Sequence, residues 1–268
     1  MVSYLFFMQA NIGGIVPLST VDWHGRSSIV LFFNGCPFRC PYCHNFDLID
    51  RKNPVDLDLI QKRISESKPF ISAVVFLGGE PLMQVKEVSE IAKIAKEKGL
   101  LVGVHTNGYF PDAVSSLIDN GLADKFFVDI KAPFEPDFYL KVTGTDANEK
   151  FGEKMIENIQ QSLKTIDASD AELEVKTTVF PNFIGSEEDI LKIAGWLDKN
   201  ISHKRKLVYV LQQGNGRNAP DPVLKNTRFF EPREMDQLAK SAGSVLKNIP
   251  ILTRTEEEGQ KEFCFKSS

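Results

Sequence analysis

The sequence predicts an α/β protein built on a parallel sheet. Short apolar runs alternate with segments that carry apolar residues at helical spacing, and several of the runs stop at turn-forming residues. Each strand and helix pair takes roughly 30 residues, the length of a βαβ unit. Six such units predict right-handed crossovers in either an open doubly wound sheet or an incomplete barrel, and periodicity does not choose between the two.

The predicted strands are continuous apolar runs, as expected for strands that are buried on both faces of a parallel sheet. They cover residues 29–33, 73–77, 100–104, 125–130, 173–180 and 206–211, with a short terminal strand around 251–253. Residues 13–26 are rich in turn formers and are predicted to be an irregular lead-in.

The predicted helices follow the strands in alternation. In the first of them, Leu57, Ile60 and Ile64 recur at helical spacing. The helices are predicted over residues 56–67, 85–98, 113–120, 149–166, 186–199 and 231–246. The polar stretch 212–225 contains two glycines and two prolines, and we predict a mobile surface loop there.

Composition limits the class of protein. The chain of 268 residues has 42% hydrophobic and 25% charged residues, which fits one globular domain with a sizeable core. A net charge of −4 argues against general binding to nucleic acid or to an anionic membrane. The first ten residues make a poor signal peptide and no apolar run is long enough to span a membrane, so we expect a cytoplasmic protein.

Three of the four cysteines, Cys36, Cys40 and Cys43, lie on one short loop with Cys-x3-Cys-x2-Cys spacing. Three thiolates on such a loop can hold three irons of a cubane iron–sulfur cluster and leave the fourth iron open for a substrate. Zinc is the competing interpretation, but structural zinc sites use four ligands, usually in pairs. Cys264 would close the open iron if it folded back to the loop; otherwise it is an incidental thiol.

Further polar residues follow the predicted strands, and ligands collect at the carboxyl ends of parallel strands. The two glycines of Gly78–Pro81 let the backbone approach a ligand closely, and Glu80 suits a cationic ammonium. Thr106 and Asn107 offer hydroxyl and amide groups. Without the cysteine loop, each of these segments would be interpreted as a turn.

Asp129 and Lys131 follow the fourth predicted strand and point to the same face, because residues two apart in a strand do so. A simple surface ion pair explains them equally well. Lys176, on the fifth strand, either meets a cofactor carboxylate or is a solvated strand residue.

At this point the sequence resembles a known family. The cysteine loop with Tyr42 before its last cysteine is similar to the signature of radical S-adenosylmethionine (radical SAM) enzymes, and the resemblance covers residues 14–211. Gly14–Trp23, Asn34–Asn45 and Gly78–Pro81 are similar to segments of glycyl-radical-enzyme activating enzymes. The nearest types are the activators of anaerobic ribonucleotide reductase and of pyruvate formate-lyase.

The resemblance implies a partial (β/α)6 barrel of the radical SAM type, a [4Fe–4S] cluster and S-adenosyl-L-methionine, whose methionine moiety chelates the open iron. It implies that the cluster ligands are Cys36, Cys40 and Cys43. It implies catalytic side chains at Asp129 and Lys131, which lie beside the cofactor. The implied cofactor-binding residues are Tyr42, Gly78, Gly79, Glu80, Pro81, Thr106, Asn107, Asp129, Lys131 and Lys176.

The chain also departs from the family pattern. Activators of pyruvate formate-lyase have an acidic residue where this chain has His105, which puts a monovalent-cation site in doubt. Lys176 stands where relatives often have arginine, so it offers a point charge instead of a planar fork.

The function implied is that of an activase. The reduced cluster would cleave S-adenosylmethionine to a 5′-deoxyadenosyl radical, which abstracts a glycine Cα hydrogen from a partner glycyl radical enzyme. Flavodoxin or ferredoxin is the expected electron donor. A radical SAM enzyme that acts on a small molecule, nucleobase or other peptide is one alternative, and a non-catalytic four-cysteine electron-transfer protein is another. We expect a single domain over 1–268, with a core at 26–212 and a C-terminal extension at 213–268.

Overall fold

The computed structural model describes residues 8–201, 207–246 and 249–263. These residues pack into two compact units. The first unit holds residues 8–37, 45–106 and 110–127. The second holds residues 38–44 and 107–109 and the described residues from 128 onward. The prediction of a single domain stays a prediction.

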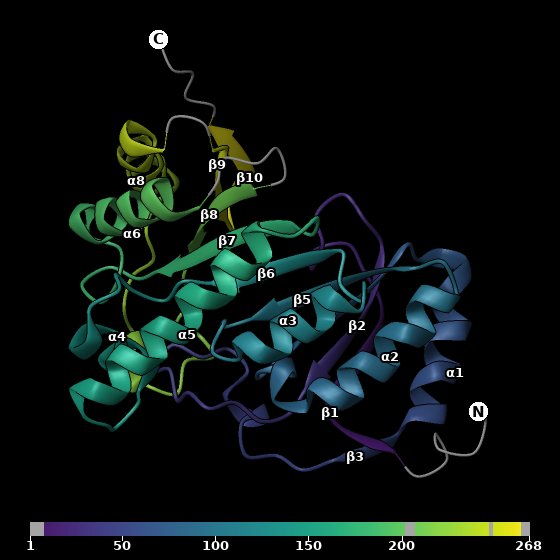
Figure 1. The fold of residues 1–268 in the computed structure, drawn as a ribbon. Coiled ribbons are helices and arrows are strands. Elements are labelled where there is room, and N and C mark those ends of the chain that lie inside the picture. The colour runs from purple at the N-terminus through teal and green to yellow at the C-terminus, as the bar shows by residue number, and fades with distance from the viewer. Residues whose placement is uncertain (1–7, 202–206, 247–248, 264–268) are drawn as a thin grey trace. The chain divides into compact units, whose positions relative to one another are not determined.

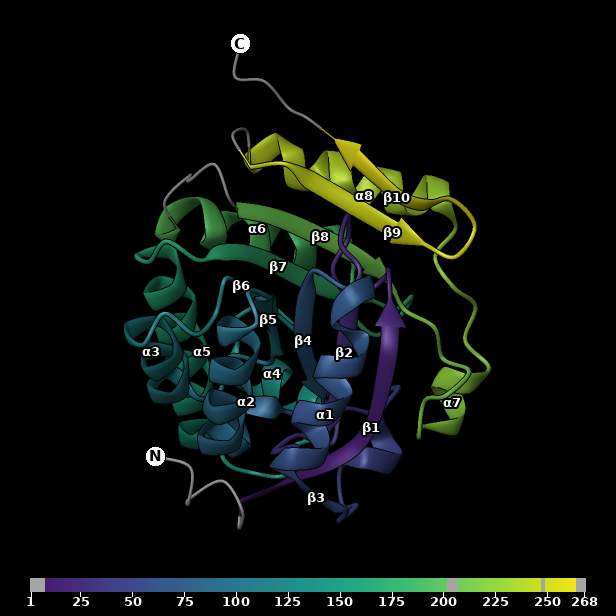
Figure 2. The same ribbon diagram turned by 90° about the vertical axis from the view of Figure 1, so that its right-hand side faces the viewer.

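The first unit contains a mixed sheet with the order β5-β4-β2-β1-β3 (Figure 1; β4 is labelled in Figure 2). Strands β2, β4 and β5 are parallel, whereas β1 runs antiparallel to both β2 and β3. The strands are β1 (Gln9–Ser19), β2 (Ser28–Phe33), β3 (Pro54–Asp56), β4 (Ala73–Gly78) and β5 (Leu101–Thr106). Every residue of β4 from Ala73 to Leu77 is buried, as the continuous apolar run predicts.

The helices of the first unit are amphipathic and bury one apolar face each. In α2 that face is formed by Val88, Ile91 and Ala95. The unit contains α1 (Leu57–Ser67), α2 (Val85–Glu97) and α3 (Pro111–Asp119), with 3-10 turns at Phe46–Leu48, Lys68–Phe70 and Pro81–Gln84. Strand β6 (Lys125–Asp129) has its first three residues in this unit and its last two in the second.

The second unit contains strands in the order β7-β8-β9-β10 (Figure 2). The first three are parallel, and β10 closes an antiparallel hairpin with β9. The strands are β7 (Glu172–Val179), β8 (Leu207–Gln213), β9 (Ile251–Thr255) and β10 (Gly259–Phe263). The helices are α4 (Pro136–Thr143), α5 (Glu149–Asp167), α6 (Glu187–Asn200), α7 (Pro222–Lys225) and α8 (Pro232–Val245).

The predicted α/β architecture and its parallel strands are confirmed, since a strand or helix lies at each of the six predicted strands and six predicted helices. The irregular lead-in predicted at 13–26 was wrong up to Ser19, because β1 pairs along two neighbours. Gly13 and Gly14 were interpreted as turn formers, but they lie within β1, where the pairing with β2 has a register shift between Ile12 and Gly14. The prediction also missed the short elements β3, α4, α7 and β10.

Candidate active site

In the first unit, the Gly78–Pro81 segment is joined to the start of the cysteine loop by backbone contacts. The Gly79 amide donates to the Phe33 carbonyl at 2.8 Å, and the Glu80 amide donates to the Gly35 carbonyl at 2.7 Å. A Cβ added to Gly79 would lie 2.0 Å from the Gly35 carbonyl oxygen and 3.4 Å from the Cys36 Cβ. Only glycine therefore fits at this approach.

The same segment also holds the far end of the cysteine loop. The Asn45 side-chain amide donates to the Gly78 carbonyl at 3.1 Å, and the Gly35 amide donates to the Leu48 carbonyl at 3.0 Å. Gly35 and Gly78 have φ values of 92° and 125°, a region that favours glycine. The residues on both sides of the three cysteines, Gly35 and Asn45, are therefore hydrogen-bonded to the segment at the end of β4.

Glu80 is a fully buried carboxylate that links the ends of two strands. Its Oε1 atom accepts the Thr106 hydroxyl at 2.9 Å and the Leu82 amide at 3.0 Å. Glu80 follows β4 and Thr106 ends β5. Glu80 thus fixes the two strand ends, and its contact with a cofactor ammonium stays a prediction.

His105 is packed within the first unit. Its ring stacks on Phe127 with centroids 4.1 Å apart, and its Nε2 lies 3.0 Å from the Asp22 carbonyl. Trp23 meets Phe127 edge-on and is buried against the strands. His105 therefore belongs to an aromatic cluster with Phe127 and Trp23.

In the second unit, Asp129 lies between two lysines. Its carboxylate is 3.3 Å from Lys131 Nζ and 3.2 Å from Lys176 Nζ. The Ile130 amide donates to the Lys176 carbonyl at 2.9 Å, which ties the segment after β6 to β7. The Lys131 and Lys176 side chains are only 14% and 19% exposed, so both ammonium groups depend on this carboxylate. The predicted same-face pair is thus in contact, together with Lys176.

Tyr42 and Lys131 lie together in the second unit. Lys131 Nζ is 6.0 Å from the centre of the Tyr42 ring, which also contacts Phe180 and Phe183. Burial raises the pKa of Tyr42 well above its ordinary value, although Lys131 opposes this. Burial is the largest single influence on Lys131 and disfavours its ammonium, but the Asp129 carboxylate, with smaller contributions from Tyr42, Cys40 and Tyr139, raises the pKa of Lys131 well above its ordinary value. Tyr42 is neutral and Lys131 charged at neutral pH.

Cys40 and Cys43 occupy a tight turn of the second unit, in which the Cys43 amide donates to the Cys40 carbonyl at 3.0 Å. Burial raises the pKa of the Cys40 thiol to about 11, with Lys131 opposing this. A metal ion bound by this sulfur would remove the proton outright, because its charge dominates such a site. The metal-free protein therefore holds Cys40 as a neutral thiol.

The end of α4 supports the same turn. The Arg39 amide donates to the Thr143 carbonyl at 2.8 Å, and Gly144 caps the helix in the left-handed region with φ 59°. A Cβ on Gly144 would lie 2.1 Å from the Arg39 carbonyl oxygen. Sequence reasoning missed this support, although Pro136 at the start and Gly144 after the end are a usable helix signal.

Asn107 shapes the turn that follows β5. Its side-chain oxygen accepts the Tyr109 amide at 2.9 Å, and the Gly108 carbonyl accepts the Ser162 hydroxyl of α5 at 2.7 Å. The amide predicted to meet a cofactor thus also serves as a local turn former.

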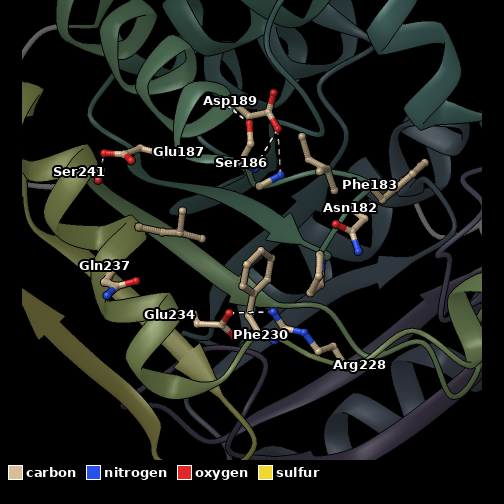
Figure 3. Close-up of a pocket in the computed structure, with 14 residues that line it drawn as sticks. Asn182, Phe183, Ser186, Glu187, Asp189, Arg228, Phe230, Glu234, Gln237 and Ser241 are labelled. Atoms are coloured by element: carbon tan, nitrogen blue, oxygen red, sulfur yellow. Dashed lines mark hydrogen bonds and ion pairs between the residues drawn. The ribbon is translucent and has the colours of Figure 1, made fainter.

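A pocket of about 530 Å³ lies elsewhere in the second unit, beside the start of α6 and one face of α8 (Figure 3). Phe183, Phe230 and Leu238 supply apolar surface there. Arg228 forms two hydrogen bonds with Glu234, at 2.7 and 2.8 Å. Sequence analysis did not predict this pocket, because its residues come from segments far apart in the chain.

The three loop cysteines form no disulfide within the described residues. Three thiols in eight residues are the donor chemistry that an iron–sulfur cluster requires, so the residues fit the group. Within the described ranges, no group of three or more His, Cys, Asp or Glu side chains is arranged to hold a single metal ion. The assignment of Cys36, Cys40 and Cys43 as ligands therefore stays a prediction. Cys264 lies outside the described residues.

Comparison with known proteins identifies the family. Residues 30–197 match the Radical SAM superfamily, and the chain belongs to it. Members of this family use a [4Fe–4S] cluster and S-adenosylmethionine. The helices in the described part of the chain include none long and apolar enough to cross a membrane.

Two relatives match over most of their length. MJ1227 of Methanocaldococcus jannaschii, a proposed glycyl-radical enzyme activating enzyme, is 32% identical over 249 residues, which cover 92% of this chain and 97% of the relative. The pyruvate formate-lyase-activating enzyme of Clostridium pasteurianum is 28% identical over 236 residues, covering 86% and 93%.

A solved structure shares the fold. The radical SAM methyltransferase from Sphaerobacter thermophilus aligns with a TM-score of 0.63 at 14% identity, covering 87% of this chain and 67% of that one. At this identity the likeness shows the fold alone, and it confirms an α/β fold of the radical SAM type.

Proposed function

We propose that this protein is a radical SAM activating enzyme that abstracts a Cα hydrogen from a glycine of a partner glycyl radical enzyme. The observation that carries the proposal is the backbone contact of Gly79 and Glu80 with Gly35, directly before the first loop cysteine. This contact joins the cysteine loop to the Gly-Gly-Glu-Pro segment. The two named relatives support the choice of a glycyl radical enzyme as partner.

In this proposal, Cys36, Cys40 and Cys43 hold the cluster, and the Gly78–Pro81 backbone receives the methionine amino group of the cofactor. A cluster held by these cysteines would supply the one electron needed to cleave S-adenosylmethionine to methionine and the adenosyl radical. Flavodoxin or ferredoxin delivers that electron.

The chain's own residues perform the binding and orienting. Glu80 and Thr106 keep the ends of β4 and β5 in register, so that the glycine backbone stays in place. Lys131 and Lys176 present cationic groups suited to the cofactor carboxylate, and Asp129 holds both of them. Tyr42, neutral and packed on Phe180, adds no charge to the loop.

The test is anaerobic reconstitution with iron and sulfide, followed by reduction in the presence of S-adenosylmethionine. We expect 5′-deoxyadenosine by mass spectrometry from the wild type and from Cys264→Ala, and neither cluster absorption nor deoxyadenosine from Cys43→Ala. Addition of a pyruvate formate-lyase type partner is expected to give a doublet glycyl EPR signal.

Two results would contradict parts of this proposal. Loss of the cluster in Cys264→Ala would support a four-cysteine electron-transfer protein. Deoxyadenosine without a glycyl signal from any partner of this class would move the substrate to a small molecule or another peptide.

A further inference from the structure

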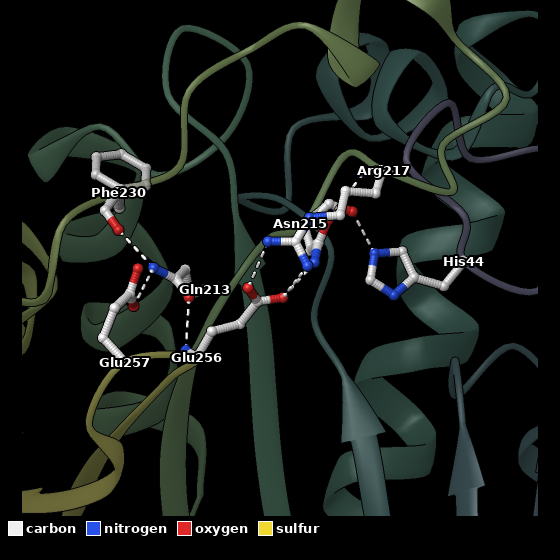
Figure 4. Close-up of polar contacts among 7 residues, drawn as sticks. All are labelled: His44, Gln213, Asn215, Arg217, Phe230, Glu256 and Glu257. Carbon is white, nitrogen blue, oxygen red and sulfur yellow. Dashed lines mark hydrogen bonds and ion pairs between the residues drawn. The ribbon is translucent and has the colours of Figure 1, made fainter.

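Two residues that directly follow loop cysteines contact a distant C-terminal segment. The Pro41 carbonyl, next to Cys40, accepts the Asp221 amide at 3.3 Å. His44, next to Cys43, meets the Asn215 carbonyl through its Nε2 atom (Figure 4). Both contacts lie within the second unit. The stretch predicted as a mobile surface loop thus touches the cysteine loop at two points.

This segment, residues 214–225, has a defined conformation of its own; we call it the strap. A Cβ on Gly216 would lie 1.9 Å from the Leu224 carbonyl oxygen, and a Cβ on Gly214 would lie 2.4 Å from the Phe180 ring. Ala219 and Leu224 are buried, and the Asp221 side chain caps α7 by accepting the Val223 amide at 2.8 Å. Close packing of this kind leaves the strap little freedom.

The strap is anchored in turn to the β9–β10 hairpin. Both terminal nitrogens of Arg217 donate hydrogen bonds to the Glu256 carboxylate, at 2.9 and 3.4 Å. The Asn215 side-chain amide donates to the same carboxylate. Gln213, at the end of β8, accepts the Glu256 amide at 2.8 Å and donates to Glu257 at 3.0 Å. Figure 4 shows these contacts running from the hairpin turn through Asn215 to His44.

From these contacts we infer that the strap, with Asn215, Arg217 and Glu256 as its positioning residues, fixes the part of the cysteine loop that carries Cys40 and Cys43 and slows loss of the cluster. The inference rests on the proposed cluster site. A cluster is lost when its loop opens to water or oxygen, and each added contact lowers the population of open loop. The C-terminal extension would thereby belong to the active site.

The test compares Glu256→Ala and Arg217→Gln with the wild type. The control is Glu258→Ala, which changes the same turn, where the Glu258 carboxylate lies 4.0 Å from the Lys261 amine. Two readouts are needed: the rate at which air bleaches the visible absorption of the reconstituted cluster, and hydrogen exchange of the peptide covering residues 40–44 in the metal-free protein. Neither requires activity.

We expect both test variants to bleach and exchange roughly two- to fivefold faster, the range set by a partly exposed ion pair. The double variant is expected to be no faster than the more affected single one, because both substitutions break the same contact. The Glu258→Ala control is expected to match the wild type.

Wild-type rates in both test variants would overturn the inference, and so would an equal increase in Glu258→Ala, which would assign the effect to the hairpin in general. If the wild type assembles no cluster, the proposed function fails instead. Hydrogen exchange would still decide whether the strap restrains residues 40–44.

Discussion

The two units hold their parts of the cysteine loop in different ways. In the first, backbone amides of Gly79 and Glu80 donate to the carbonyls of Phe33 and Gly35, and the Asn45 side chain adds a bond to the Gly78 carbonyl. In the second, the turn of Cys40 and Cys43 is held by side chains as well as by backbone bonds of Arg39 and Pro41 to segments far away in the sequence. The close approach at Gly79 allows only glycine, whereas a side-chain contact can be built from many residues. The first part should therefore fail abruptly on substitution, and the second gradually.

The largest expected effect comes from Gly79→Ala. Its Cβ would lie 2.0 Å from the Gly35 carbonyl oxygen, so the end of β4 must shift away from the residue before Cys36. We expect at least about a 100-fold loss of deoxyadenosine formation, the scale of a misplacement near 1 Å. Single-turnover mass spectrometry measures it. Gly195→Ala in α6, where a Cβ meets nothing within 4 Å, is the control, and equal activity of the two variants would refute the steric argument.

Next in size is Asp129→Asn in the second unit. The substitution leaves Lys131 and Lys176, both mostly buried, beside each other without their shared carboxylate. We expect the free energy of unfolding to fall by about 1–3 kcal/mol, less than for a fully buried pair because the carboxylate is partly exposed. Urea unfolding of the metal-free protein measures the change.

Glu157→Gln provides the control for that measurement, since Glu157 pairs with Lys154 on an open helix face where both side chains are about two-thirds exposed. Its effect is expected to stay below about 0.5 kcal/mol. If Asp129→Asn were as mild as this control, Asp129 would be no more than a surface partner.

Thr106→Val tests a buried side-chain contact of the first unit, the one between Thr106 and Glu80. The valine removes the hydroxyl that donates to the buried Glu80 carboxylate at 2.9 Å. We expect a loss of about 1–2 kcal/mol, measured as a roughly tenfold weaker Kd for S-adenosylmethionine. Thr106→Ser keeps the donor and is expected to restore binding. A serine variant as weak as the valine would show that packing of the methyl group matters instead.

The same contrast explains what could be predicted from the sequence. Strands and helices follow from local periodicity, and Gly78 and Gly79 stand out because close backbone approach leaves a visible glycine. The pairing of Asp129 with Lys131 follows from strand geometry.

The remaining contacts could not be predicted, because they join residues far apart in the chain. Nothing local links His44 to Asn215 or Arg39 to Thr143, and a segment rich in glycine and proline at 212–225 has the composition of a mobile loop even when it is packed. Thr106 was predicted to contact a cofactor through its hydroxyl, but the hydrogen bond from that hydroxyl to Glu80 is seen only in the structure. Composition reports which groups are present, and long-range packing decides what they meet.

The smallest expected effect is a pH-dependent loss of stability in the second unit, where Arg228 pairs with Glu234. Arg228 lowers the pKa of Glu234 from 4.5 to about 2, chiefly by hydrogen bonding. A carboxyl group whose pKa is lowered by folding contributes stability that is complete above its unfolded value and is lost as the pH falls through the folded one. Glu234→Gln is therefore expected to lower the free energy of unfolding by about 0.5–1 kcal/mol at neutral pH, since the pair is partly exposed.

That difference from the wild type should shrink between pH 4.5 and about 2, the window set by the two pKa values. Urea unfolding across this range measures it, with Glu66→Gln, which alters a more exposed pair in the first unit, as the control. A difference that did not change with pH would mean that the carboxylate acts through packing alone. The backbone contacts of Gly79 and Glu80 carry no titrating group, so acid should weaken this part of the second unit while leaving them intact.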